Sequence, residues 1–308
     1  MKVLIIGGTG MIGAHAALHL RSLGHSVTIS GRRPPVTTPS LAELPFLAGD
    51  YLTKDDFSPS SLSQFEAIVF AAGSDIRHVP EGSAADEHYL SANGSAVPSF
   101  ARLARDAGVK IFVHIGSAYP HVVPEKVAES AYVRSRKLAA DGITQLAGPE
   151  FFAVSLDAPI VVGGVPSMPV APFFQASIQY AEGRLPIPAF APPGGMNFIS
   201  TRSLSEAISG ALENAAALSG RAVLVGDENL TYAEYLGAFF AAAGNAQELA
   251  VLEQDHPLMP RATRYAGDGL VRYEPDAGDV KLLGGHRRND IKNAIEELVR
   301  YSKEGSSA

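Results

Sequence analysis

A glycine-rich segment near the start of the chain has the residue types and spacing to bind phosphate groups. It reads Gly7-Gly8-Thr9-Gly10-Met11-Ile12-Gly13 and lies between an apolar run and a helical pattern. In such a turn Gly7 permits the tight bend, Gly10 lets the backbone approach a pyrophosphate, and Gly13 lets the helix pack closely on the strand. Free N–H groups at the helix start face the phosphates. The segment predicts a dinucleotide site that includes Gly7, Thr9, Gly10, Met11, Ile12 and Gly13.

The residues after the second apolar run indicate which dinucleotide is bound. Units that bind NAD usually place an acid about twenty residues beyond the turn, where it bonds the adenosine ribose. This chain has Ser30-Gly31-Arg32-Arg33 there. An acid would repel a 2′-phosphate, whereas arginine binds one through paired charged hydrogen bonds. Ser30, Gly31, Arg32 and Arg33 therefore favour NADP(H) over NAD(H), although two arginines are also typical of a solvated loop.

The elements that must position these residues alternate between short apolar runs and longer helical patterns as far as about residue 155. Buried parallel strands are expected at Val3–Ile6, Ser26–Ser30, Pro45–Ala48, Ala67–Ala71, Lys110–Ile115 and Phe151–Leu156. Helices are expected between them at Met11–Leu23, Ala84–Ala107 and Val127–Leu146, and Gly24 and Gly108 are placed to end two of these. The alternation predicts an α/β fold with a Rossmann-type, doubly wound parallel sheet.

The second half of the chain differs in composition and no longer alternates regularly between short apolar runs and helical patterns. Residues 165–193 are rich in proline and apolar side chains. Helices are expected at Phe173–Glu182, Ser203–Leu218, Thr231–Ala243 and Arg288–Ser302, and a strand at Ala222–Val225. We therefore predict a dinucleotide-binding domain over 1–160 and a smaller C-terminal substrate-binding region over 161–308. Within this region, segments at about 197–225 are expected to return to the main sheet.

The composition excludes several classes of protein. The 308 residues carry a net charge of −7 without a basic stripe, which argues against a nucleic-acid partner. The absence of cysteine excludes disulfides, thiolate catalysis and cysteine-ligated metals. No apolar run reaches the roughly 18 residues of a membrane span, and the first strand begins too early to leave room for a signal peptide. We expect a cytoplasmic protein with no membrane partner.

Further motifs carry a resemblance to a known family. Gly49-Asp50-Tyr51 follows the third expected strand, and Phe70-Ala71-Ala72-Gly73 lies at the end of the fourth. Residues 107–118 contain the fifth expected strand and end just after Ser117. Asn93 lies in a predicted helix, and residues 156–163 follow the sixth strand. With the glycine turn, these resemble the short-chain dehydrogenase/reductase superfamily in its extended or atypical branch, which includes NAD-dependent epimerases and dehydratases. The resemblance implies that the cofactor also contacts Asp50, Tyr51, Ala71, Ala72, Gly73, Pro159 and Ile160.

The chemistry of this family needs a serine, a tyrosine and a cation. The serine holds a substrate carbonyl, the tyrosine passes a proton, and the cation lowers the pKa of the tyrosine. The resemblance gives these roles to Ser117, Tyr132 and Arg136, with Asn93 as the helix asparagine of the extended branch. The family has lysine where this chain has Arg136, followed by Lys137. Arg136 shares the helix face of Tyr132 but cannot lose a proton, whereas Lys137 lies about 140° around the helix.

The resemblance implies an enzyme, an NAD(P)-dependent oxidoreductase acting on a carbonyl or alcohol of a small-molecule substrate. Aromatic residues of the proline-rich segment suggest that this substrate is apolar, although they fit a packing role equally well: Phe173, Phe174, Tyr180 and Phe190. A nucleotide-sugar epimerase or dehydratase, an isomerase or lyase, and a sensor that binds NADP(H) without turnover stay open. In many relatives the two long helices at 84–107 and 127–146 form a dimer interface, so a homodimer is also possible.

The histidines form no evident metal set, so no metal site is expected. His15 and His19 share a helix face without a third ligand, and His114 lies within a strand, so we interpret all three as structural. Tyr119 and His121 lie close to Ser117. Tyr119 is expected to line the substrate entrance, and His121 is a weaker candidate for substrate contact.

Overall fold

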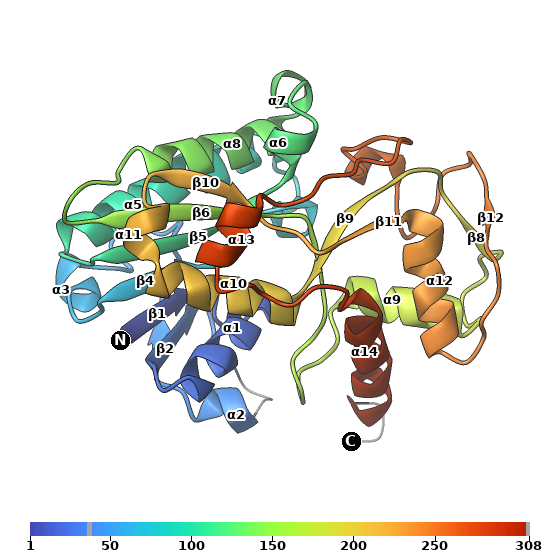
Figure 1. The fold of residues 1–308 in the computed structure, drawn as a ribbon, viewed down its shortest axis with the longest axis horizontal. Helices are drawn as coiled ribbons and strands as arrows, with labels where there is room; N and C mark the ends of the chain where they lie inside the picture. The colour runs from blue at the N-terminus through green and yellow to red at the C-terminus, as the bar shows by residue number, and fades with distance from the viewer. Residues whose placement is uncertain (36–38, 306–308) are drawn as a thin grey trace.

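Seven parallel strands form the core of the larger of two lobes in the computed structural model, which describes residues 1–35 and 39–305 (Figure 1). In spatial order they are β3 (Phe46–Ala48), β2 (Ser26–Gly31), β1 (Lys2–Ile6), β4 (Ala67–Phe70), β5 (Ile111–Ser117), β6 (Phe152–Ala158) and β10 (Arg221–Leu224). The strand order reverses between β1 and β4, so a crevice opens at the carboxyl ends of the strands there. The predicted doubly wound sheet is confirmed.

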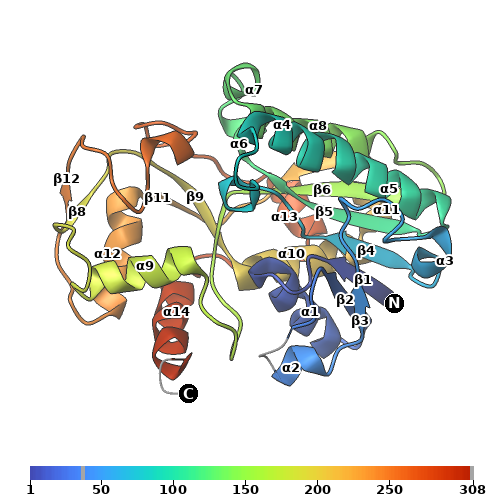
Figure 2. The ribbon, with the colours of Figure 1, turned by 180° about the vertical axis from the view of Figure 1, so that it is seen from behind.

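Helices cover both faces of this sheet because alternate residues of each strand point to opposite sides. Val3 and Ile5 of β1 pack in one cluster with α1 (Met11–Ser22) and α10 (Thr201–Glu213), whereas Leu4 and Ile6 pack with α5 (Ala96–Asp106). Figure 2 shows the second face, where α5 lies beside α8 (Ala131–Thr144). The short α2 (Pro39–Ala42), α3 (Pro59–Leu62) and α11 (Ala215–Leu218) complete this lobe.

Two of the expected long helices are interrupted. The expected helix over 84–107 consists of α4 (Ala85–Tyr89), a π-helical turn at Leu90–Ser95 and α5. The expected helix over 127–146 is broken at Ser130, between α7 (Lys126–Glu129) and α8. Ser130 has an extended backbone, and its hydroxyl accepts a hydrogen bond from the N–H of Val133, so it caps a new helix and ends the earlier one. Both interruptions lie close to predicted site residues.

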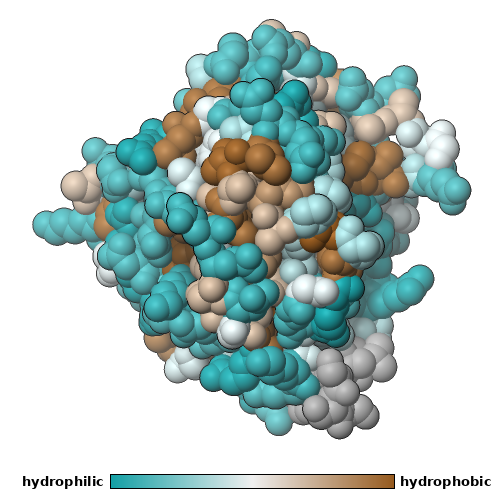
Figure 3. Space-filling model, turned by 90° about the vertical axis from the view of Figure 1, so that its right-hand side faces the viewer, coloured by the Kyte–Doolittle hydropathy of each residue, from teal (hydrophilic) through white to brown (hydrophobic). Residues whose placement is uncertain are grey.

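The smaller lobe has a second sheet that periodicity did not predict. It consists of β7 (Ile160–Val162), β9 (Gly195–Ser200) and β11 (Glu228–Thr231), in the order β11-β9-β7. The helices of this lobe are α9 (Pro172–Ala181), α12 (Tyr232–Ala242) and α14 (Ile291–Gly305). At its outer end β8 (Phe190–Ala191) pairs with β12 (Ala250–Val251), and Figure 3 shows that this end presents apolar side chains among many hydrophilic ones.

The aromatic side chains of the proline-rich segment pack the interior of this lobe. Phe174, Tyr180 and Phe190 are buried in one cluster with α12 and α14. The Tyr180 hydroxyl donates to the carbonyl of Phe190 at 2.7 Å and accepts from its N–H at the same distance. The suggestion that these rings contact substrate is therefore wrong for Phe174, Tyr180 and Phe190, because all three are buried in the core of the lobe. Phe173 is partly buried and packs against the same cluster.

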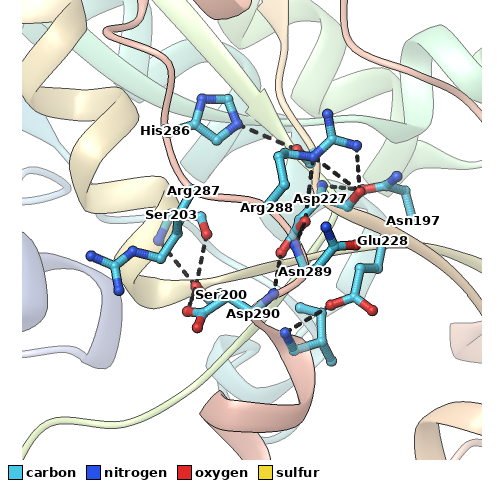
Figure 4. A network of polar contacts seen from close by, with 12 residues as sticks. Asn197, Ser200, Ser203, Asp227, Glu228, His286, Arg287, Arg288, Asn289 and Asp290 are labelled. Atoms are coloured by element: carbon cyan, nitrogen blue, oxygen red, sulfur yellow. Dashed lines mark hydrogen bonds and ion pairs between the residues drawn. The ribbon is translucent and has the colours of Figure 1, made fainter.

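A polar network joins the two lobes where the chain passes from α13 (Ala277–Leu282) to α14 (Figure 4). The buried carboxylate of Asp227 accepts hydrogen bonds from the backbone N–H groups of Asn289 and Asp290 and pairs with Arg288 at 3.3 Å. Asp290 in turn accepts from Ser200 at the start of α10. Among residues 1–35 and 39–305, no helix has both the length and the apolar character to cross a membrane.

Candidate active site

The glycine turn is held closed by its own backbone and by the end of β4. Gly7 has φ +79°, and a methyl group built on it would lie 2.8 Å from the Ala72 nitrogen. A methyl group on Gly13 would overlap the carbonyl of Gly7. Gly10 is different, since its φ is −87° and, beyond its chain neighbours, the described residues place a single atom within 4 Å of such a methyl group, at 3.4 Å. Contacts within the protein therefore explain why glycine is needed at positions 7 and 13. At position 10 they do not, and the space beside Gly10 is open to a ligand.

The end of β2 leaves polar groups available beside this turn. A methyl group on Gly31 would lie 2.7 Å from the hydroxyl of Thr9, so glycine is needed for the two segments to pack. The Ser30 hydroxyl is buried and has no hydrogen-bond partner among the described residues. Arg32 and Arg33 are exposed, and within the described chain no hydrogen bond or ion pair engages either guanidinium. An anionic ligand would find both cations free.

The other predicted cofactor residues surround the same crevice. Tyr51 packs edge-on against Phe70, with ring centroids 5.1 Å apart, and burial raises the pKa of Tyr51 to about 12. One carboxylate oxygen of Asp50 accepts the N–H of Leu52 at 3.0 Å, which leaves the other for a ligand. Met11 and Ile12 begin α1, Ala71, Ala72 and Gly73 follow β4, and Pro159 and Ile160 follow β6. The donors and the open space suit a nicotinamide dinucleotide.

Ser117 and Tyr132 lie on neighbouring elements. Ser117 ends β5, is 7% exposed, and its hydroxyl accepts the N–H of Tyr119 at 3.4 Å. Tyr132 lies in the first turn of α8. Burial raises the pKa of Tyr132, and the positive charge of Arg136 opposes this effect only in part. Arg136 therefore acts on the pKa of Tyr132 in the direction that the resemblance implies, while burial of the phenol has the larger effect.

Aromatic rings enclose Tyr132. The ring of Tyr265 stacks on it at 4.9 Å and 15°, and the ring of Tyr89 meets it edge-on at 5.4 Å. Tyr265 also contacts Tyr119 at 5.1 Å. A surface hollow opens here, lined by Ile76, Asp86, Tyr89, Glu129, Ser130, Ala131, Tyr132, Ala262, Thr263 and Tyr265. The sequence offered no sign of Tyr265, which lies in an irregular segment far along the chain.

Arg136 extends from α8 toward the sheet. Its Nη2 donates to the carbonyl of Ile115 at 2.8 Å, and Nη1 lies 2.7 Å from where a methyl group on Gly73 would be. Its Nε is buried and has no hydrogen-bond partner within the described residues. Lys137 instead pairs with Asp141 on the surface, at 2.8 Å. The structure brings Arg136, and not Lys137, to the side of the crevice.

Asn93 has every polar atom engaged within the protein. Its side-chain oxygen accepts the N–H of Ser74 at 2.9 Å, and its nitrogen donates to the Ser74 carbonyl at 2.8 Å and to the Ser135 hydroxyl at 3.2 Å. The π-helical turn at 90–95 directs this side chain inward. Asn93 therefore ties the segment after β4 to α8, and it acts on the site by positioning both.

His15 lies at the contact between α1 and α10. His15 Nδ1 lies 2.8 Å from the Ser205 hydroxyl of α10, and burial lowers the pKa of His15 to about 4. No cluster of three or more potential metal-ligating side chains occurs in the described parts of the chain.

Comparisons with known proteins identify relatives of the chain in sequence and in fold. Among curated sequences, a UDP-glucose 4-epimerase of Klebsiella pneumoniae is 32% identical over 127 residues, which are 38% of this chain and 90% of that protein. UDP-glucose 4-epimerase 3 of Oryza sativa subsp. japonica is 28% identical over 167 residues, 49% of this chain and 43% of the rice protein. The matched part thus spans less than half of that relative.

Solved structures share the fold over the whole chain. A UDP-glucose 4-epimerase of Stenotrophomonas maltophila, with bound NAD and formylated UDP-arabinopyranose, has a TM-score of 0.79 at 20% identity and covers 100% of this chain and 99% of its own. A UDP-glucuronic acid 4-epimerase of Bacillus cereus in complex with NAD has a TM-score of 0.72 at 17% identity, with 99% of both chains covered.

The NAD-dependent epimerase/dehydratase family matches residues 3–166, more than half of the 308 residues. This confirms the resemblance drawn from the motifs and the expectation of an NAD(P)-dependent enzyme of the short-chain dehydrogenase/reductase type. The chain belongs to the NAD-dependent epimerase/dehydratase family.

Proposed function

We propose that this protein is an NADPH-dependent reductase of a small apolar carbonyl compound, or the corresponding alcohol dehydrogenase. The observation that supports this most is the aromatic enclosure of a protonated Tyr132. The phenol of Tyr132 is protonated at neutral pH, as that of an ordinary tyrosine is, and burial raises its pKa further. Such a phenol is the acid that a carbonyl oxygen needs as it becomes an alcohol. The half-buried ring of Tyr265, which stacks on Tyr132, offers an apolar surface to the body of a substrate.

Each side chain has a defined task in this proposal. The Ser117 hydroxyl orients the substrate oxygen, and the Tyr132 hydroxyl donates the proton to it. The fixed positive charge of Arg136 stabilises the phenolate that remains. A bound nicotinamide supplies the hydride-transfer chemistry. The surrounding rings keep water away from the reacting oxygen, which strengthens these electrostatic effects.

The charges around the hollow favour a substrate without phosphate. Asp86 lines it and would repel an anionic diphosphate, whereas the second lining carboxylate, Glu129, is paired with Lys126 at 2.6 Å. Of the nearby arginines, Arg77 is paired with Asp75, and Arg264 is bonded to Asp268 at 2.7 Å. A neutral apolar carbonyl compound meets no such charge conflict.

The proposed preference for NADPH depends on the free guanidinium groups beside the glycine turn. Arg32 and Arg33 are exposed at the end of β2, where the 2′-phosphate of the adenosine ribose is expected. The segment from Ser26 to Pro35 contains no acidic residue that would repel that phosphate.

A nucleotide-sugar epimerase is the second candidate. The curated relatives bear that name, and one observation in the smaller lobe favours it. The Arg264 side chain is 2% exposed, yet its Nη2 has no hydrogen-bond partner in the described chain. A buried unpartnered N–H is a possible contact for a phosphate oxygen. An epimerase would interconvert sugars without net consumption of dinucleotide.

The two candidates are separated by following both reactions with one preparation. We expect NADPH oxidation that depends on added aromatic or aliphatic ketones, with no interconversion of UDP-glucose and UDP-galactose. Tyr132→Phe should lower kcat by about 10²- to 10⁴-fold, because it removes the acid. Tyr301→Phe on α14 is the matched control and should behave as wild type. Sugar interconversion without ketone-dependent oxidation would refute the reductase, and tight NADPH binding with neither reaction would indicate a sensor.

A further inference from the structure

Four polar side chains form a continuous hydrogen-bonded chain at the edge of the site, and none has a task in the proposed reaction. His114 Nδ1 lies 2.9 Å from the Ser155 hydroxyl, and this hydroxyl donates to Asp157 Oδ1 at 2.5 Å. The second oxygen of Asp157 lies 2.6 Å from His121 Nε2. His114 and Ser155 are 0% exposed and Asp157 is 1% exposed, whereas the side chain of His121 is 36% exposed. The chain of contacts therefore runs from the core to the surface.

The sequence builds this arrangement through strand register. His114 of β5 is paired with Ser155 of β6, and Gly116 is paired with Asp157. A methyl group on Gly116 would overlap the Asp157 carboxylate and lie 2.6 Å from the Ser155 hydroxyl. Glycine at this position, directly before Ser117, is therefore required for the carboxylate to lie where it does.

The donor pattern identifies which group can change its charge. Ser155 gives its proton to Asp157, so its oxygen accepts from the Nδ1–H of His114. Burial lowers the pKa of His114 well below the ordinary value, and the charge of Arg136 acts in the same direction, so His114 stays neutral. His121 is the member that can gain a proton opposite the carboxylate.

His121 belongs to α6 (Tyr119–Val122), the short helix that directly follows Ser117. The backbone of this turn is joined to β6 by the N–H of Ala118, which donates to the Ala158 carbonyl at 2.9 Å. The contact of His121 with Asp157 adds a side-chain tie between the same two segments. The His121–Asp157 contact therefore connects the turn that carries Ser117 and Tyr119 to β6, which is followed directly by Pro159.

We propose that His121 and Asp157 are a pair of positioning residues that hold the Ser117 turn against β6, and that the pair holds it most firmly when His121 is protonated. The effect on turnover rests on the proposed function, whereas the effect on the turn itself does not. His121 would then act through Ser117 and Tyr119, and not by touching substrate.

The surroundings of His121 give the direction of the pH dependence. The hydrogen bond with Asp157 raises the pKa of His121, burial opposes this, and Lys137 and Asp141 of α8 act in opposite directions. Tyr273 is a further titratable neighbour of Asp157, whose charge raises the pKa of Tyr273. Because the pKa is raised in the folded protein, the pair stabilises the turn at low pH. This stabilisation is lost as the pH rises through the raised pKa of His121.

Hydrogen exchange of residues 117–122, followed by mass spectrometry and corrected for the intrinsic effect of pH, tests the proposal without any substrate. In the wild type we expect exchange to increase on the order of three- to tenfold as His121 loses its charge, since a charged hydrogen bond is roughly twice as strong as a neutral one. His121→Gln should show the faster exchange at every pH. His121→Lys, which stays charged, should show slow exchange throughout. His25→Gln, on a half-buried histidine directly before β2, is the matched control.

The same variants connect the turn to turnover. We expect kcat of the wild type to fall by a similar factor over the same pH range, and His121→Lys to lose this dependence while KM changes little. Equal protection of residues 117–122 in the wild type and in His121→Gln at low pH would overturn the proposal, whatever the activity. Normal pH-dependent protection in a protein that reduces no ketone would leave the pair intact and refute the proposed function instead.

Discussion

Replacing Gly10 with alanine separates a requirement for binding from a requirement for folding. The φ of Gly10 is −87°, which alanine adopts without strain, and the added methyl group would meet the Gly7 carbonyl oxygen at 3.4 Å. The same change at Gly13 would drive a methyl group into the backbone of Gly7, with 2.8 Å to its carbonyl carbon. Gly10→Ala should therefore fold normally and bind dinucleotide poorly, whereas Gly13→Ala should destabilise the folded protein.

The expected magnitudes follow from these contacts. Gly10→Ala should change the free energy of unfolding by less than about 1 kcal/mol, because two effects oppose each other. Alanine lowers the conformational entropy of the unfolded chain, which stabilises the fold, but it is a poorer N-cap than glycine, which destabilises it. Its methyl group occupies the space left for the pyrophosphate, so we expect Kd for NADPH to rise at least about tenfold, or ~1.4 kcal/mol. Gly13→Ala should cost about 1–3 kcal/mol through overpacking, which lowers Tm by roughly 2–4 °C for each kcal/mol.

Two measurements decide the matter, a fluorescence titration with NADPH and a thermal unfolding scan without ligand. Gly24→Ala is the control for a substitution at a glycine with φ +85° outside the site, and it should lower Tm without changing Kd. If Gly10→Ala bound NADPH with the affinity of the wild type, the open space beside Gly10 would not be the pyrophosphate position. The assignment of the turn would then be refuted.

Three further changes test other parts of the structure. Arg32→Asp should reverse the preference for NADPH over NADH in the same titration, and an unchanged ratio of the two Kd values would remove Arg32 from the phosphate site. Tyr265→Ala should raise KM for apolar ketones two- to tenfold by removing a stacking ring worth about 0.5–1.5 kcal/mol, whereas Tyr265→Phe should not. Burial would raise the pKa of Asp290, but hydrogen bonds from Arg202 and Ser200 lower it below 3.8, so it stabilises the fold above that pH. Asp290→Asn should cost about 2 kcal/mol in denaturant melts at neutral pH, because it weakens hydrogen bonds to a charged group. The difference from wild type should shrink as the pH falls through the lowered pKa of Asp290.

The larger lobe could be predicted from the sequence because its elements are local and strongly patterned. Strands such as Ala67–Phe70 are buried on both faces and appear as unbroken apolar runs. The glycines at 24 and 108 have φ of +85° and +89°, which is why glycine ends those helices. The same locality makes the glycine turn readable, since strand, turn and helix lie within about twenty residues.

The smaller lobe and the walls of the site could not be predicted in this way. The second sheet pairs β7, β9 and β11, which are short and are separated by long stretches of chain. The sequence of one such segment does not indicate which other segment it pairs with. The ring stacked on Tyr132 comes from Tyr265, more than a hundred residues away in an irregular segment. The break at Ser130 depends on a side-chain cap that competes with a continuous helical pattern. In each case a contact distant in sequence, or a single hydrogen bond, outweighs local propensity.

The arginine in place of the family's lysine is matched by its surroundings. Its guanidinium fits under Gly73, where any side chain would collide with Nη1, and it is fixed by the carbonyl of Ile115. A group held in this way supplies a constant charge, and it cannot carry a proton to or from Tyr132 at any physiological pH. A proton returned to Tyr132 must then come from another group or from solvent, and the hollow lined by Tyr132, Tyr89 and Tyr265 is one such route. In the proposed reaction Tyr265 would therefore border both the substrate and this route to solvent, so its replacement should be followed in kcat as well as in KM.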